Sequence, residues 1–300
     1  MVLFDVVIPV FLMIFLGYTG QKILKLDIKP ISTLAIYVLT PPLIFRVFYD
    51  TPLDRGILYV ALYSMLLPVV IVGLVYLLSK CHLVPKESQP SIMLSTAFIN
   101  TGNMGAPVML FAFGEAGFNY AMIINLFHSI AMNTLGIYIA AGGSRQDLKK
   151  TLMTLLKFPI NHAMILALIW KILEPPMSDN IYKTLRLVGD TSVMLVVVIL
   201  GMQLAECRIT NLNFLKLTTA ILLRLIVSPA IAFAIVLFLP VSKLWQQVMI
   251  LEAAMPTAAF IAMYAVQYNQ EPDFVTSVTF FTTLLSGVTL MVIIPLVLRM

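Results

Sequence analysis

The stretch AFINTGNMGAPVML, residues 97–110, places polar and helix-breaking residues in the middle of an apolar run. Proline lacks a backbone N–H and its ring collides with the preceding helical turn, while two nearby glycines lower the free-energy cost of leaving helical dihedral angles. The sequence therefore predicts a membrane helix that unwinds between Asn100 and Pro107. The alternative is a close helix-packing face, because Gly102 and Ala106 have the Gly-x-x-x-small spacing of such faces.

A second apolar run is interrupted in a similar way. Pro256 and Thr257 lie at the centre of LEAAMPTAAFIA, residues 251–262. In hydrocarbon an unpaired peptide group costs several kcal/mol, so irregular backbone persists only where it is buried in protein or lines a wet cavity. The two breaks together therefore predict a cavity near the middle of the membrane. Single prolines in membrane helices are typical of simple kinks, which is the interpretation for Pro68, Pro229 and Pro295.

The composition excludes a water-soluble protein. Of the 300 residues 60% are hydrophobic and only 11% are charged, whereas soluble domains carry about 25% charged residues. Apolar runs of about 17–25 residues recur along the whole chain and predict about ten membrane-spanning helices. They cover residues 4–21, 30–49, 56–79, 89–113, 117–141, 158–174, 183–205, 211–239, 244–268 and 274–298. Cys81 and Cys207 lie far apart and join no Cys/His cluster, so neither a disulfide nor a metal site is predicted.

The two breaks fall in the fourth and ninth predicted spans, which is the same place in each half of the chain. The predicted fold is therefore an all-α membrane protein with two inverted five-helix repeats and crossing broken helices. Residues 1–141 form the first repeat, residues 142–157 a basic connection, and residues 158–300 the second repeat. Most Lys and Arg residues fall on the side of that connection when the spans alternate. This bias predicts a cytoplasmic central loop and places both termini outside.

The breaks carry the residues that we expect to bind a substrate. A half-helix that restarts inside the membrane presents free N–H groups and a partial charge of about +0.5 at its first turn. Neutral amides and hydroxyls add further hydrogen-bond donors, so an anion is held without a permanent buried cation. For Pro41 and Pro42, which interrupt the second span, a packing kink is the alternative. The predicted substrate-binding residues are Asn100, Thr101, Asn103, Gly105, Pro107, Met255, Pro256, Thr257, Pro41 and Pro42.

Glu252, His128 and Arg224 are ionisable residues inside predicted spans, where charges are costly and often functional. Glu252 precedes Pro256 by one helical turn, and a desolvated carboxylate there is a candidate for proton exchange; a boundary residue that reaches water is the alternative. His128 is a candidate proton relay or a neutral imidazole that is hydrogen-bonded to a neighbouring helix. Arg224 has three possible roles: it balances the charge of a substrate carboxylate, it pairs with a residue of another helix, or its long side chain extends to the membrane interface.

Three short motifs give the sequence a family resemblance. NTGNMGAP, residues 100–107, resembles the N-T-x-x-M-G-x-P crossover of the auxin efflux carrier family, which includes plant auxin exporters and bacterial permeases for malate or other carboxylates. AAMP, residues 253–256, resembles the second crossover of that family, and YNQEPD, residues 268–273, resembles the loop that enters its last helix. With the matching order of spans, the resemblance covers nearly the whole chain.

The resemblance implies ten helices in inverted repeats, a scaffold domain that often dimerises, and a transport domain with crossing helices. It also implies a substrate carboxylate near Asn100, Pro107 and Pro256. Phe158-Pro159 departs from the Asn-Pro that often opens the sixth helix of the family, and leaves a site role for that helix unsupported. The central loop is much shorter than in plant carriers. Auxin as the substrate does not follow, because the side chains of the cavity set the shape of the substrate.

The predicted function is a secondary transporter of the plasma membrane that moves a small organic anion, a carboxylate, by alternating access. An ion- or solute-conducting channel is the alternative, since broken helices also line pores. An intramembrane enzyme is the weaker alternative, because the spans contain no H-E-x-x-H, no G-x-S-x-G and no close Asp/Glu pair. The expected partners are the anion, the lipid bilayer, a second copy of the chain in a homodimer, and a coupling proton or sodium ion. No cofactor and no nucleic acid are expected.

Overall fold

The computed structural model describes residues 3–52, 54–143, 159–207, 209 and 213–300. Over these residues the protein is helical, with one isolated β-bridge. Seven helical stretches are long and apolar enough to cross a membrane, and the apolar helix Pro159–Leu173 is shorter. The prediction of an all-α membrane protein is confirmed, whereas the count of ten helices in inverted repeats stays a prediction. The predicted basic connection lies outside the described residues except for its first two glycines.

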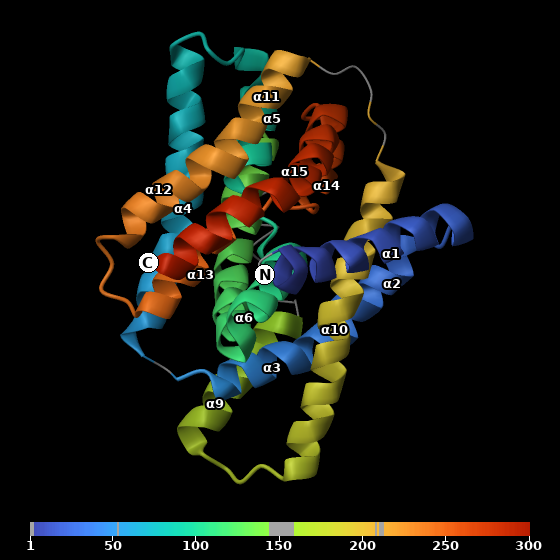
Figure 1. Ribbon diagram of the computed structural model, residues 1–300, viewed down its shortest axis with the longest axis vertical. Coiled ribbons are helices and arrows are strands. Elements are labelled where there is room, and N and C mark those ends of the chain that lie inside the picture. The colour runs from blue at the N-terminus through green and yellow to red at the C-terminus, as the bar shows by residue number, and fades with distance from the viewer. Residues whose placement is uncertain (1–2, 53, 144–158, 208, 210–212) are drawn as a thin grey trace.

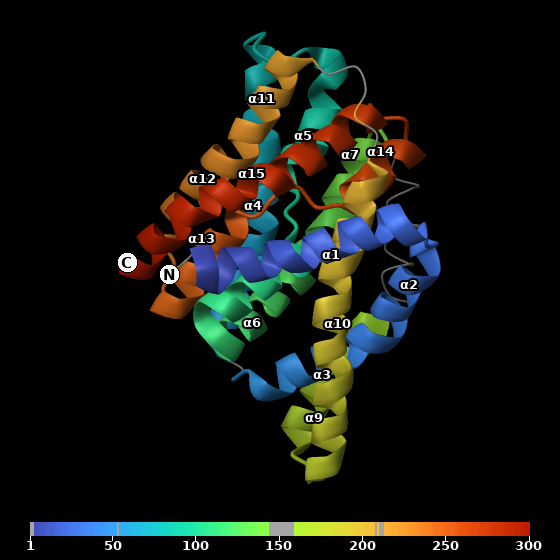
Figure 2. The same cartoon turned by 45° about the vertical axis from the view of Figure 1, so that its right-hand side comes forward.

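One set of helices packs together around α10, and we call it the first helix group. Helix α1 packs along α10, and α3 packs against both α9 and α10. Figures 1 and 2 show α1 and α3 crossing the long α10. The members are α1 (Ile8–Leu24), α2 (Ile28–Leu34), α3 (Thr40–Asp50), α9 (Pro159–Leu173) and α10 (Asp179–Glu206), with π-helical turns at Leu3–Val7 (η1) and Ala35–Leu39 (η2).

The remaining helices form the second helix group. Helix α4 packs against α5 and α6, and α13 packs against α6, α12 and α15. The members are α4 (Arg55–Lys80), α5 (Gln89–Ala97), α6 (Ala106–Ala131), α7 (Ile137–Ala140), α11 (Phe214–Leu222), α12 (Ser228–Val236), α13 (Lys243–Ala253), α14 (Ile261–Gln267) and α15 (Pro272–Arg299). Short turns join them at Lys86–Ser88 (η3), Thr101–Gly105 (η4), Met132–Gly136 (η5) and Leu223–Val227 (η6).

Large apolar side chains remain exposed along these helices. Phe15 of α1, Leu62 of α4, Met194 of α10 and Val288 of α15 each expose more than half of their surface. Contiguous apolar surface of this extent is rare on soluble monomers. The exposed faces are therefore the surfaces that contact lipid.

Gly114 ends the helical segment, residues 101–113, that follows the first break. The helical stretch Thr101–Ala140 is 40 residues long, and Gly114 inside it has φ +69° and ψ −161°. Residues other than glycine rarely adopt that backbone conformation. The chain turns there between the predicted fourth and fifth spans, at the position where the sequence separates them.

The predicted interruption of the second span at Pro41 and Pro42 is wrong. Residues Ile28–Asp50 form one helical stretch of 23 residues. The two prolines lie in the first turn of α3, directly after the π-helical turn Ala35–Leu39. A wider turn releases the backbone hydrogen bonds that proline cannot make, so the helix continues without a break.

A polar connection at residues 268–271 leads into α15 and is held by Glu271. This residue has φ +44° and precedes the first turn of the helix. Its carboxylate accepts hydrogen bonds from Ser91, from Ser88 at 3.2 Å and from Lys216 at 2.5 Å. Burial raises the pKa of Glu271, but the hydrogen bonds from Lys216 and Ser91 outweigh burial and hold the pKa below its usual value.

We expect Glu271→Gln to lower the unfolding temperature of the detergent-solubilised protein more at about pH 7 than at about pH 3. A carboxylate with a lowered pKa contributes stability above its unfolded pKa, and this stability disappears as the pH falls through the folded pKa. Thermal unfolding at both pH values measures the difference. Glu174→Gln, an exposed carboxylate change, is the control. Equal losses for Glu271→Gln at both pH values would contradict the electrostatic explanation.

Candidate functional site

The first break covers residues 98–100, so it begins two residues before the predicted segment Asn100–Pro107 and overlaps that segment only at Asn100. Helix α5 ends at Ala97, Phe98 is extended with φ −108° and ψ 123°, and the helix restarts at Thr101. We call residues 101–113 the half-helix. Pro107 therefore lies inside the restarted helix instead of in the break. The π-helical turn Thr101–Gly105 before it accommodates the missing N–H.

The second break runs from Ala254 to Phe260, between α13 and α14, and pairs with the first. The N–H of Asn100 donates to the carbonyl of Pro256 at 2.9 Å, and the N–H of Ala258 donates to the carbonyl of Phe98 at 3.0 Å. Ile99 and Thr257 thereby form an antiparallel bridge. Peptide groups that leave the helices thus satisfy one another inside the membrane, where water is absent.

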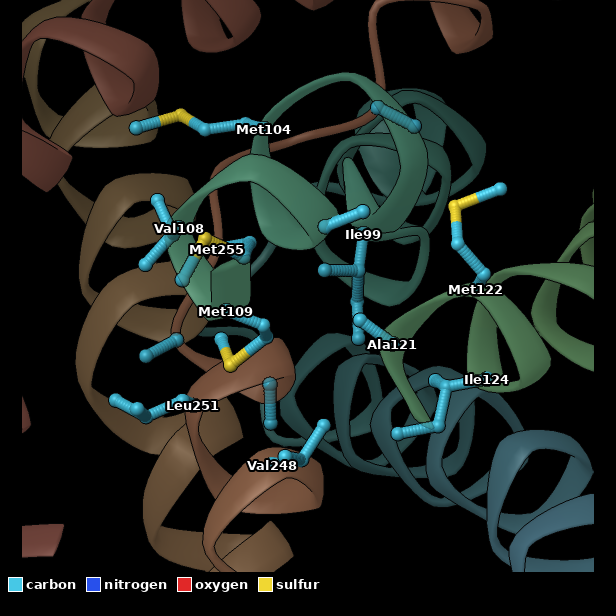
Figure 3. Close-up of a cluster of buried hydrophobic side chains, with 14 of the residues drawn as sticks. Ile99, Met104, Val108, Met109, Ala121, Met122, Ile124, Val248, Leu251 and Met255 are labelled. Atoms are coloured by element: carbon cyan, nitrogen blue, oxygen red, sulfur yellow. The ribbon is translucent and has the colours of Figure 1, made fainter. Parts of the chain in front are cut away.

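Apolar packing surrounds this bridge. Figure 3 shows Met104, Val108 and Met109 of the half-helix together with Leu251 and Met255 of the other interrupted segment. These side chains belong to one buried apolar cluster that also contains Ile99. The two breaks are therefore held by dispersion contacts as well as by backbone hydrogen bonds.

Arg224 joins the ends of the two helices that precede the breaks. Its side chain is 0% exposed, Nη1 donates to the carbonyl of Thr96 at 2.5 Å, and Nη2 donates to the carbonyl of Ala253 at 2.7 Å. Ser228 accepts from Nη2 and donates to the same Ala253 carbonyl at 3.2 Å. The last carbonyls of a helix carry partial negative charge. One guanidinium thus stabilises both helix ends, and Arg224 does not reach the membrane interface.

His128 holds the extended segment of the first break. Its Nε2 accepts a hydrogen bond from the N–H of Ile99 at 2.9 Å, and the imidazole also bonds to the backbone of Ser64. Nε2 acts as an acceptor only when it carries no proton. This geometry favours the structural interpretation of His128, and its role as a proton relay stays a prediction.

Glu252 contacts the half-helix at Gly105 and does not line the cavity described below. Its carboxyl is 0% exposed, and neither oxygen has a hydrogen-bond partner among the described residues. The carboxyl packs against Gly105 so closely that a Cβ at that position would overlap it. Glu252 therefore does not reach water at a membrane boundary.

A cavity of about 230 Å³ opens beside the breaks, between the two helix groups. The first group contributes Thr40, Ile160 and Ser192, and the second contributes the start of the half-helix and one face of α6. Lys, Arg, Asp and Glu are absent from its lining among the described residues. The polar lining residues are Thr40, Asn100, Thr101, Gly102, Asn103, Asn125, His128, Ser129, Asn133, Asn161 and Ser192.

The cavity offers hydrogen-bond donors to an anion. The first N–H groups of a helix have no intrahelical partner, and Thr101, Gly102 and Asn103 of the first turn line the cavity. Asn100 is 4% exposed, and its Nδ2 has no hydrogen-bond partner among the described residues. Thr101 donates to Oδ1 of Asn125 at 2.7 Å. These donors and the positive end of the helix dipole suit a carboxylate or a similar anion.

The cavity contains some of the predicted site residues and not others. Asn100, Thr101, Asn103 and His128 line it. Thr257 and the Pro256 carbonyl belong to the bridge, and they and Met255 are absent from the lining. Gly105 and Pro107 lie further along the half-helix, and Pro41 and Pro42 are half-buried outside the lining. The list of predicted substrate-binding residues did not include Thr40, the neighbour of Pro41, whose hydroxyl lies 2.9 Å from that of Ser192, or Asn133, which accepts from the Tyr264 hydroxyl at 2.6 Å. Polar residues at helical spacing inside apolar spans are the signal that could have found them.

Comparisons with known proteins place the chain in a transporter family. The model of the family described as "Membrane transport protein" matches residues 2–294. An uncharacterized transporter of Methanocaldococcus jannaschii is 30% identical over 95% of this chain and 96% of its own length. An uncharacterized transporter of Methanothermobacter thermautotrophicus is 27% identical over 95% of each chain. The chain therefore belongs to the membrane transport protein family, which is the auxin efflux carrier-like group that its three short motifs resemble.

Proposed function

We propose that this membrane transporter is a secondary carrier of a small organic anion, a carboxylate, and that the substrate binds at the start of the half-helix. The observation that carries the proposal is Asn100, which lines the cavity at the start of the half-helix and whose buried Nδ2 has no hydrogen-bond partner among the described residues. An amide donor beside a helix N-terminus stabilises a carboxylate, and the apolar wall accommodates the body of the substrate.

Alternating access is the mechanism that the position of the cavity supports. The cavity lies between the two helix groups, so movement of one group against the other opens it to opposite sides in turn. In the sequence, five predicted spans precede the connection at residues 142–157 and five follow it, and the fourth of each set carries a predicted break. This order supports the inverted-repeat arrangement that is part of the proposal.

The test is uptake of labelled malate and indole-3-acetate by purified protein in liposomes. Carrier-mediated uptake saturates and shows counterflow, whereas a channel shows neither. Asn100→Ala is expected to weaken the apparent affinity about 10- to 100-fold, because a hydrogen bond to a charged group contributes about 1.5–3 kcal/mol. Pro256→Ala is expected to lower turnover, because alanine restores the backbone N–H and the free φ that proline removes, so α13 can extend and displace the carbonyl that accepts from the N–H of Asn100.

Asn180→Ala, on the exposed surface of α10, is the matched control and is expected to retain wild-type uptake. The unfolding temperature of each variant in detergent shows whether it is folded. Folded Asn100→Ala with wild-type kinetics would remove the proposed binding position. Saturable uptake of neither anion by folded wild-type protein would contradict the choice of a carboxylate.

A further inference from the structure

We propose that Glu252 is the proton-carrying group of this transporter, and that one proton crosses the membrane together with each anion. The inference rests on the proposed function and adds the coupling ion to it. It depends on three features of the molecule, namely the isolation of the Glu252 carboxyl, its contact with the half-helix, and the fixed charge of Arg224.

The surroundings of Glu252 favour its neutral form in this conformation. The carboxyl is 0% exposed, and both oxygens lack hydrogen-bond partners among the described residues. Burial of an ionised carboxylate without partners is far more costly than burial of the neutral acid. Glu252 therefore carries a proton here, and it has to meet water in another conformation in order to release that proton.

Glu252 and the proposed anion position share one helical segment. The carboxyl contacts Gly105, while Thr101 and Asn103 of the same half-helix line the cavity. An ionised Glu252 thus places a negative charge within one or two helical turns of the bound anion. Like charges at such separations in a weakly polar interior repel each other by an amount that matters for binding.

The positive charge of Arg224 is balanced either by an ionised Glu252 or by the anion in the cavity. Its guanidinium donates to the carbonyl of Ala253, the residue next to Glu252, and forms no ion pair with a carboxylate among the described residues. Arginine keeps its proton in proteins. With Glu252 neutral, an anion in the cavity balances this fixed positive charge; with Glu252 ionised, the charge is already balanced. Anion and proton therefore bind together.

The other groups around Glu252 do not offer an equivalent carrier. The Tyr63 hydroxyl of α4 donates to the Met249 carbonyl at 2.8 Å, and His128 of α6 holds the N–H of Ile99. A sodium ion in such carriers uses carbonyls released by broken helices, but those of Thr96 and Ala253 already accept from Arg224.

The experiment compares two modes of transport in liposomes, using whichever of labelled malate and indole-3-acetate the wild-type protein takes up. Protein-free liposomes correct for passive entry. An acid-outside gradient of one pH unit is expected to support about tenfold accumulation by wild-type protein, since one pH unit equals one tenfold step for one coupled proton. A protonophore is expected to abolish it. In Glu252→Gln the accumulation is expected to disappear while counterflow remains, because the neutral amide imitates the protonated acid permanently.

Glu87→Gln, an exposed carboxylate change in η3, is the matched control and is expected to accumulate the anion as wild-type protein does. Equal gradient-driven accumulation by Glu252→Gln and wild-type protein, with counterflow in both, overturns the proton assignment and leaves the proposed carrier function standing. Absence of counterflow in wild-type protein overturns both the carrier function and the proton assignment.

A second measurement needs no variant. Binding of the same anion to wild-type protein in weakly buffered detergent is expected to withdraw about one proton from solution near the pH at which Glu252 loses its proton. Absence of proton uptake at every pH overturns the assignment.

Discussion

Arg224→Leu is expected to abolish anion transport and to lower the thermal stability of the protein in detergent more than any surface change. The substitution removes the buried guanidinium and leaves the carbonyls of Thr96 and Ala253 without their donors. Unsatisfied buried groups cost about 1–3 kcal/mol each. The ends of α5 and α13 also lose the cation that balances their dipoles, so the two breaks separate from each other.

Arg224→Lys separates the effect of charge from the effect of geometry. Lysine keeps the positive charge but presents one ammonium in place of a fork, so it cannot reach both carbonyls as the guanidinium does. We expect an unfolding temperature between those of Arg224→Leu and wild-type protein. Arg186→Leu, which removes an exposed arginine that pairs with Glu115 and Asp190, controls for loss of charge. Surface ion pairs contribute about 0–1 kcal/mol. Unfolding of Arg224→Leu at the wild-type temperature would contradict the role of the guanidinium.

The sequence predicted the fold class and both interruptions from local chemistry. Apolar runs and scarce charges predict membrane helices directly, and Pro256 lies where α13 has given way to irregular backbone. The first break was displaced because Pro107 is tolerated early in a restarted helix. The residues that leave the helix, Phe98 and Ile99, do so because a distant segment supplies hydrogen-bond partners. No local sequence pattern identifies the distant segment with which they pair.

The site was less predictable than the fold because its lining comes from separate helices. Asn100 and Thr101 carry a local signal, since they flank the break. Thr40 and Ser192 are far apart in sequence and face the same cavity only because α3 packs against α10 within the first helix group. The role of Arg224 depends on two carbonyls, and backbone acceptors have no sequence signature. The sequence thus indicated where chemistry occurs and left the partners to tertiary packing.

Helices α1 and α10 approach each other so closely that no side chain fits between them at Gly17 and Gly201. Substitutions at this contact are therefore expected to destabilise the protein strongly. A Cβ at Gly17 would overlap the carbonyl of Val198, and a Cβ at Gly201 would overlap the carbonyl of Ile14. Both obstacles are backbone atoms, which cannot move aside unless the helices separate. Gly17→Ala and Gly201→Ala are therefore each expected to destabilise the protein by about 1–3 kcal/mol. Thermal unfolding in detergent measures the loss.

Gly20→Ala in the same helix is the matched control, because no atom lies within 4 Å of its added Cβ. Alanine is also the better helix former by about 0.5–1 kcal/mol, so this variant is expected to be at least as stable as the wild-type protein. The double variant at Gly17 and Gly201 distinguishes close helix contact from two independent clashes. If one methyl group already separates α1 from α10, the second costs less, and the combined loss is smaller than the sum of the two single losses. Full additivity would mean that each glycine relieves its own local strain, and that the two helices are not held at one shared distance.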